Sequence, residues 1–267
     1  MSDNNIESLV HYTKEYKTIE KILLNGFRYS YCEEKFIIPS LWIPMICFCN
    51  IPFEFTKKHR EEYGSYAIGL NKENLLNKEK RFLNPVIYCH SEWLKTGLSS
   101  LNKEYNAIMN EIAVSIEPTN CPNCCVVTNG HSALIAAKHS EALITRELSY
   151  SILGFTKPYA DILENGNLKE NYLENEWRFV IPSGSKAISG GKINWLDENQ
   201  YLEWLKHNQI LKVYQYFDIE DITMLIVTTD TEKSLLTDFI IKSDSLMQKP
   251  INNEQKRTLL SQIVSYQ

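Results

Sequence analysis

Several features that define common protein classes are missing from this chain of 267 residues. Its 28 basic residues are outnumbered by 33 acidic ones, so a formal charge of -5 provides no overall positive field to attract nucleic acid. No apolar run reaches the roughly 18 residues that a membrane span needs. The start MSDNNIES lacks the basic and apolar stretches of a secretory leader. We therefore expect a cytoplasmic protein with no membrane contact, in which any nucleic-acid contact is local.

Three signatures of common enzyme classes are absent as well. The chain contains no phosphate-binding loop of the Walker type, no His-Glu-x-x-His zinc helix and no Gly-x-Ser-x-Gly nucleophile turn. The Gly- and Ser-rich stretch 183–191 has the spacing of no nucleotide-binding loop, and a flexible turn between strands explains it. These absences argue against P-loop enzymes, zinc proteases and α/β-hydrolases.

The seven cysteines are an odd number, which favours free thiols in a reducing compartment. Three of them, Cys121, Cys124 and Cys125, form the stretch CPNCC, and His131 follows. A Cys-x-x-Cys turn is half of a zinc site, but no second pair of this kind occurs in the chain. The alternatives are a zinc site that includes His131 and a surface turn with free thiols. We predict the surface turn, without a metal.

The chain does contain enough apolar residues for a substantial core. Hydrophobic residues make up 43% of it and aromatic residues 11%, which is typical of a folded globular protein. Helix-type and strand-type patterns are mixed along the chain, with no repeats and no long linker. We predict an α+β fold in a single domain over residues 1–267, with a mainly helical insertion at about 100–156.

The spacing of apolar residues and of Gly and Pro predicts the individual elements. Strands are expected at 8–13, 42–53, 65–70, 84–89, 176–182 and 222–229. Helices are expected at about 16–25, 54–63, 102–116, 132–155, 199–209 and 231–243. The stretch 71–82 is typical of a solvated helix or loop, and 156–175 of a polar loop broken by Pro and Gly.

Two polar residues stand at the ends of predicted strands. His11 either hydrogen-bonds a ligand's sugar or phosphate, or it caps the helix that follows or is satisfied within the core. Glu176 is costly to bury without a partner. Either Arg178 on the same strand face neutralises it in a structural ion pair, or the strand aims it into a cleft where it stabilises positive charge. The spacing leaves both alternatives open.

Several spaced stretches resemble the AbiGi family of abortive-infection proteins, which act in phage resistance. They are HYTKEYKTIEKILLNGF, IPMICFCNIPFEFTKKHREEYGSYAIGLNKE, NPVIY, GFTKPY and NEWRF, and together they span most of the chain. The family is described as the antitoxin half of a two-gene system. The resemblance therefore implies a role in defence against phage and a toxin as the partner protein.

The order of motifs is also similar, more distantly, to the ADP-ribosyltransferase fold, which includes DarT-like toxins and RNA phosphotransferases. The motifs are a strand with His-x-Thr, an L-x-x-G turn, a strand reading apolar-x-Phe and a final strand preceded by Glu. This resemblance implies a split mixed sheet, NAD as substrate and Glu176 as the catalytic residue that stabilises the oxocarbenium-like transition state. The NAD-binding residues that it implies are His11, Tyr12, Thr13, Phe48, Asn50, His59 and Tyr66.

The second motif departs from that fold. Many such transferases have Tyr-Phe where this chain has Cys47-Phe48, so the ring that stacks on nicotinamide has to come from Phe48, Tyr63 or Tyr66. His59 and Arg60 either meet the NAD phosphates or the acceptor, or lie on a solvated helix face.

Two functions follow from these resemblances. The first is an NAD-dependent ADP-ribosyltransferase toxin in anti-phage defence that modifies RNA or single-stranded DNA, for which 15 tyrosines offer stacking surfaces. The alternative is a non-catalytic antitoxin that binds and restrains a toxin, for which the acidic charge suits a basic partner. We favour the enzyme from the sequence, and expect Glu176→Ala to abolish transfer while leaving thermal stability unchanged or raised.

Overall fold

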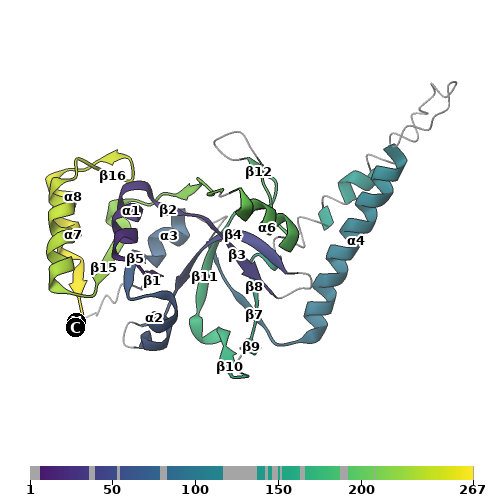
Figure 1. Ribbon diagram of the computed structural model, residues 1–267, viewed down its shortest axis with the longest axis horizontal. Coiled ribbons are helices and arrows are strands. Elements are labelled where there is room, and N and C mark those ends of the chain that lie inside the picture. The colour runs from purple at the N-terminus through teal and green to yellow at the C-terminus, as the bar shows by residue number, and fades with distance from the viewer. Residues whose placement is uncertain are drawn as a thin grey trace.

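A mixed β-sheet forms the centre of the protein (Figure 1). The structure is a computed structural model and describes residues 7–35, 40–52, 55–78, 83–116, 137–141, 144–145, 150, 152–162, 166–186, 192–207 and 209–266. Along the sheet the order is β18-β15-β5-β1-β4-β11-β6, and β3 pairs with β4. The bounds are β1 Ser8–Thr13, β3 Ser30–Glu34, β4 Leu41–Cys49, β5 Tyr66–Asn71, β6 Leu83–Pro85, β11 Glu176–Val180, β15 Ile222–Val227 and β18 Ile263–Ser265.

All neighbours in this sheet run antiparallel except β15 and β18, which are parallel. The predicted α+β class with a mixed sheet is therefore confirmed. Among the described residues, five further pairs of short strands accompany the sheet. Their bounds are β2 Phe27–Arg28, β7 Ile87–Cys89, β8 Thr156–Pro158, β9 Ala160–Ile162, β10 Leu168–Glu170, β12 Ser185–Lys186, β13 Lys192–Ile193, β14 Tyr214–Gln215, β16 Ser245–Leu246 and β17 Lys249–Pro250.

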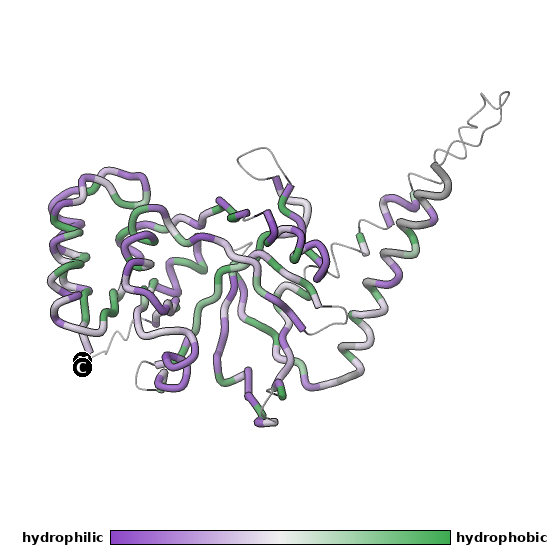
Figure 2. Tube along the Cα trace, in the orientation of Figure 1, coloured by the Kyte–Doolittle hydropathy of each residue, from purple (hydrophilic) through white to green (hydrophobic). Residues whose placement is uncertain are grey.

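The helices pack around the sheet, except that α4 extends away from it (Figure 1). Their bounds are α1 Tyr16–Asn25, α2 Lys57–Tyr63, α3 Lys72–Lys78, α4 Glu92–Ile116, α6 Glu198–Lys206, α7 Asp230–Lys242 and α8 Asn253–Ser261, with short 3-10 turns η2 Asn171–Glu174 and η3 Ile219–Asp221. Figure 2 shows hydrophobic stretches along several of the central strands, whereas hydrophobic and hydrophilic residues alternate along the helices. Among the described residues, no helix is both long enough and apolar enough to span a bilayer.

Glycine sets the ends of the two helices that flank β1. Gly26 follows α1 with φ 80° and donates its backbone N–H to the Ile22 carbonyl. Gly64 follows α2 with φ 114°, and a Cβ at this position would lie 2.1 Å from the Thr13 carbonyl oxygen in β1. Only glycine fits there, because a side chain would meet both an unfavourable φ and the neighbouring backbone. This close approach holds α2 against the strand that carries His11.

Alternation along β4 divides the core into two parts. Ile46 and Phe48 face the large cluster that α1 and α7 complete, whereas Ile43 and Met45 face a smaller cluster that contains Trp195. Successive side chains of a strand point to opposite faces, so β4 is covered on both. Because both faces of β4 pack against a core cluster, its sequence is apolar on both faces.

Four sequence-based boundaries are wrong. The stretch 156–175, expected as a polar loop, forms β8, β9, β10 and η2, because its backbone pairs with β7 and with itself as a hairpin. The expected strand 84–89 is two strands, of which β6 pairs with β11 and β7 with β8. The expected strand 42–53 ends at Cys49, and the helix expected from 102 begins at Glu92.

Other expected elements lie where the spacing predicts them. Ile19, Ile22 and Leu23 are the buried face of α1. The C-terminal helix α8 and strand β18 were not predicted. The expected Cys-rich turn, with Cys121, Cys124, Cys125 and His131, lies outside the described residues, as does half of the expected helix 132–155.

Candidate functional site

A cavity of about 440 Å³ lies where β1, β4 and β11 meet α2 and the segment from β8 to η2. Its size is within the range of small-ligand pockets. Five of the residues predicted from the sequence line it, namely His11, Tyr12, Phe48, His59 and Glu176. They come from four separate elements, so the fold brings together residues that are up to 165 positions apart in the sequence.

Thr13, Asn50 and Tyr66 do not line this cavity. The Tyr66 hydroxyl donates to Glu232 Oε1 at 2.7 Å, at the start of α7. Asn50 Nδ2 donates to Glu7 Oε1 at 2.6 Å. The Tyr66 side chain therefore contacts the start of α7, and the Asn50 side chain contacts the residue before β1.

Glu176 is the first residue of β11 and is 7% exposed. Its Oε1 accepts a hydrogen bond from Arg178 Nε at 2.7 Å, and its Oε2 lies 3.1 Å from Lys157 Nζ. Residues two apart on a strand point to the same face, which is why Arg178 reaches it. The ion pair with Arg178, which one of the two alternatives from the sequence requires, is therefore present, and Glu176 also lines the cavity that the other alternative requires.

Arg178 is buried and bridges two carboxylates. It is 1% exposed, and its Nη2 lies 2.7 Å from Glu34 Oε1 in β3. Its Nη1 donates to the Gly154 carbonyl at 3.2 Å. The guanidinium thus joins β3 and β11 across β4, which runs between them.

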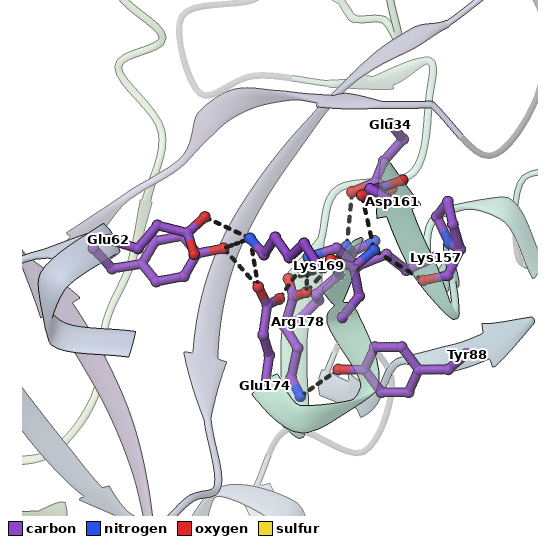
Figure 3. A network of polar contacts seen from close by, with 12 residues as sticks. Glu34, Glu62, Tyr88, Lys157, Asp161, Lys169, Glu174 and Arg178 are labelled. Carbon is purple, nitrogen blue, oxygen red and sulfur yellow. Dashed lines mark hydrogen bonds and ion pairs between the residues drawn. The ribbon is translucent and has the colours of Figure 1, made fainter. Parts of the chain in front are cut away.

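Further ion pairs lead from Lys157 through Glu174 and Lys169 to Glu62 (Figure 3). Lys157 lies 2.6 Å from Glu174 Oε2, and Lys169 lies 2.9 Å from Glu174 Oε1. Lys169 also pairs with Glu62 of α2 at 2.5 Å. The Tyr63 hydroxyl donates to Glu174 at 2.9 Å. Each of the three cations Lys157, Lys169 and Arg178 therefore has at least two carboxylate partners from the chain itself.

The two carboxylates of Arg178 have opposite pKa shifts. Burial alone raises the pKa of Glu176, but the charges of Arg178 and Lys157 and the Arg178 hydrogen bond outweigh it and lower this pKa to about 2. Burial raises the pKa of Glu34 to about 7, and the nearby Glu176 charge adds to the rise that Arg178 opposes. At neutral pH, Glu176 is therefore an anion and Glu34 is close to its titration point.

His11 is held in one orientation by the sheet. Its Nδ1 lies 2.8 Å from the Cys47 carbonyl oxygen, which accepts the Nδ1–H. Burial lowers the pKa of His11, so the ring is neutral at pH 7 and its Nε2 is an acceptor. Its ring packs against Phe27 and Phe48, at centroid distances of 5.1 and 5.7 Å.

The aromatic residues around the cavity differ in exposure. Phe48 is 2% exposed and its ring contacts Phe27 and Phe179 edge-on, as part of the core. Tyr63 is partly exposed and its ring lies 4.4 Å from that of His59. The rings on α2 therefore have more freedom to meet a ligand than Phe48.

Sequence reasoning missed several residues of the site, which are Glu34, Lys157, Asp161, Lys169, Asn171 and Glu174. Most of them lie in the stretch that was interpreted as a polar loop. One signal was available, because Lys157 stands among apolar residues in GFTKPY and a lysine in such a stretch needs a carboxylate partner. The partner carboxylate is Glu174, 17 residues away in the sequence, and no local sequence pattern identifies it as the partner.

Asn171 is completely buried in the wall of this cavity. Its Nδ2 donates to the Pro158 carbonyl at 3.0 Å and to Asp161 Oδ2 at 2.8 Å. Its Oδ1 has no hydrogen-bond partner among the described residues. The described part of the chain contains no cluster of His, Cys, Asp and Glu side chains that would hold a metal ion.

The fold and the cavity together define an α+β protein whose central sheet carries a buried network of paired charges. A comparison with family models adds the identity of the family. Residues 16–228 match the model described as "Putative abortive phage resistance protein AbiGi, antitoxin". The match covers well over half of the chain, so the protein belongs to the AbiGi family, as the sequence motifs indicated. Neither the curated proteins nor the solved structures yielded a match. The resemblance to the ADP-ribosyltransferase fold therefore stays a prediction.

Proposed function

We propose that this protein is an antitoxin of a phage-defence pair, and that it acts by binding a toxin rather than by catalysis. The observation that supports this most directly is the state of Glu176. Both of its carboxylate oxygens are engaged by cations of the chain, Arg178 Nε at 2.7 Å and Lys157 Nζ at 3.1 Å. A carboxylate stabilises developing positive charge on a sugar when it faces that sugar, and two adjacent cations weaken this effect.

The other charges of the cavity support the same proposal. The diphosphate of NAD needs cations, but Lys157, Lys169 and Arg178 are each paired with carboxylates of the chain. The description of the family as an antitoxin and the formal charge of -5 fit a protein that covers a basic toxin surface.

Growth rescue tests this proposal. Cells that express the toxin gene paired with this one would be given the wild-type chain, His59→Ala or Glu176→Gln. Both substitutions alter the cavity, and we expect rescue by all three chains wherever thermal melts show that the chain is folded. Failure of the wild-type chain to rescue would contradict the proposal, as would loss of rescue in a folded His59→Ala variant, because the cavity would then be needed.

A second candidate function is NAD-dependent ADP-ribosyl transfer to nucleic acid. The observation in its favour is that one cavity gathers His11, Tyr12, His59 and Glu176. Labelled NAD would be mixed with the purified protein and with RNA, single-stranded DNA or cellular protein, beside a Glu176→Gln control. Label that the wild-type protein transfers and the variant does not would replace the antitoxin proposal. No label, with no effect of NAD on the melting temperature, would retain it.

A further inference from the structure

The hairpin of β9 and β10 has two faces of different chemistry. Asp161 pairs in register with Lys169, and both line the cavity. The next register pair is Ile162 with Leu168, and alternation turns it to the opposite face. There Ile162 is 80% exposed and Leu168 is 64% exposed. Two large aliphatic side chains thus stand side by side on the outer face of the hairpin.

This hairpin is held firmly from its inner side. Lys169 is paired with Glu62 of α2 and with Glu174 of η2. The rings of Tyr159 and Tyr172 stack at a centroid distance of 4.3 Å and an interplanar angle of 14°, which ties the residue just before β9 to η2 after the hairpin. The outer apolar pair is therefore presented on a pre-organised support, which lowers the entropy cost of binding.

The charge of the hairpin selects among possible partners. The one lysine of β9 and β10, Lys169, lines the cavity and is paired with Glu62 and Glu174, so it adds no positive charge to the outer face. Glu170 is exposed, and it lies on the same face as Leu168, two residues along the strand. Nucleic-acid phosphates and anionic membrane surfaces are repelled by such a segment. A second copy of this chain would bring the same acidic segment to the contact. A protein with an apolar surface and a basic margin is complementary to it.

We infer that the outer hairpin face, formed by Ile162, Leu168 and Glu170, docks onto an apolar surface with a basic margin on the toxin. This inference rests on the proposed antitoxin function and identifies the surface that carries it out.

The affinity for the purified toxin encoded by the paired gene tests this inference. Isothermal titration calorimetry would compare the wild-type chain with the double variant Ile162→Ser/Leu168→Ser and with Glu170→Lys. A matched control is Leu235→Ser/Ile241→Ser on α7, where both side chains are about half exposed, at 52% and 51%. We expect the Kd to rise at least tenfold for the double variant and severalfold for Glu170→Lys, and to stay within twofold for the control.

Thermal melts of each variant check folding, which serine at exposed positions leaves intact. If the hairpin variants bind as tightly as the wild type, the docking surface is wrong and the antitoxin function stands. If the hairpin and control variants weaken binding equally, the docking surface is also wrong. If the wild-type chain does not bind the toxin, both the surface and the proposed function fail.

Discussion

Substitution of Glu176 by Ala distinguishes between two roles for this carboxylate, which are stabilisation of the fold and binding of a ligand. The variant removes the Arg178 Nε contact at 2.7 Å and the Lys157 Nζ contact at 3.1 Å. The two cations are only 1% and 15% exposed, so water replaces the lost partner poorly. The contacts therefore lead us to expect a loss of stability, which is the opposite of the expectation from the sequence.

The size of this loss of stability depends on the carboxylate partners that Arg178 and Lys157 keep in the variant. Removal of one partner of a buried ion pair typically costs about 3–5 kcal/mol. Arg178 keeps Glu34 at 2.7 Å and Lys157 keeps Glu174 at 2.6 Å, so neither charge is left alone. We therefore expect the lower end, about 3 kcal/mol, which corresponds to a fall in melting temperature of roughly 6–12 °C for a chain of this size.

Urea unfolding at pH 7 measures the free energy of unfolding of the wild type and of Glu176→Ala. The control is Glu203→Ala, which removes an exposed contact to Lys206 at 3.0 Å and is expected to have no measurable effect. A Glu176→Ala variant as stable as the wild type would refute the reasoning. The cations would then not depend on this carboxylate, and its role in a ligand site would regain support.

Two further predictions concern the same part of the fold. Because the pKa of Glu34 is raised to about 7 from 4.5, the folded state binds more protons than the unfolded state between these values, so this residue makes stability fall as pH rises from about 4.5 to 7. Glu34→Gln is expected to flatten that part of the pH–stability curve, and an unchanged slope in urea unfolding would contradict the assignment. Gly64→Ala is expected to destabilise the protein by more than about 1 kcal/mol, because φ is 114° and the new Cβ meets the Thr13 carbonyl oxygen. A melting temperature within 1 °C or so of wild type, at roughly 2–4 °C per kcal/mol, would show that the backbone relaxes easily.

Much of the sheet could be predicted because its strands have strong local signals. The runs that form β4 and β15 are apolar and bounded by turn residues, and the glycine after α1 marks where that helix ends. The hairpin of β9 and β10 could not be predicted in this way. Its strands are three residues long and polar in part, and cross-strand pairing stabilises them more than local propensity.

Only part of the site could be predicted, because only some of its residues have a local signal in the sequence. His11 and Glu176 were identified because a polar residue at the end of a buried strand is conspicuous in sequence. The two cations that pair with Glu176 differ in how far they lie from it in the sequence. Arg178 is two residues away, whereas Lys157 comes from a separate strand, and only the fold brings it to the carboxylate. Long-range ion pairs have no sequence period, so their members are found from the structure.

The central claim is that the protein acts by binding a toxin and needs no substrate to do so. Size-exclusion chromatography with light scattering, applied to the purified chain and the purified product of the paired toxin gene, tests it most directly. In the absence of NAD or any other nucleotide, we predict that the two proteins elute together with the combined mass of a defined complex. Separate elution of the two proteins at micromolar concentrations would contradict the claim.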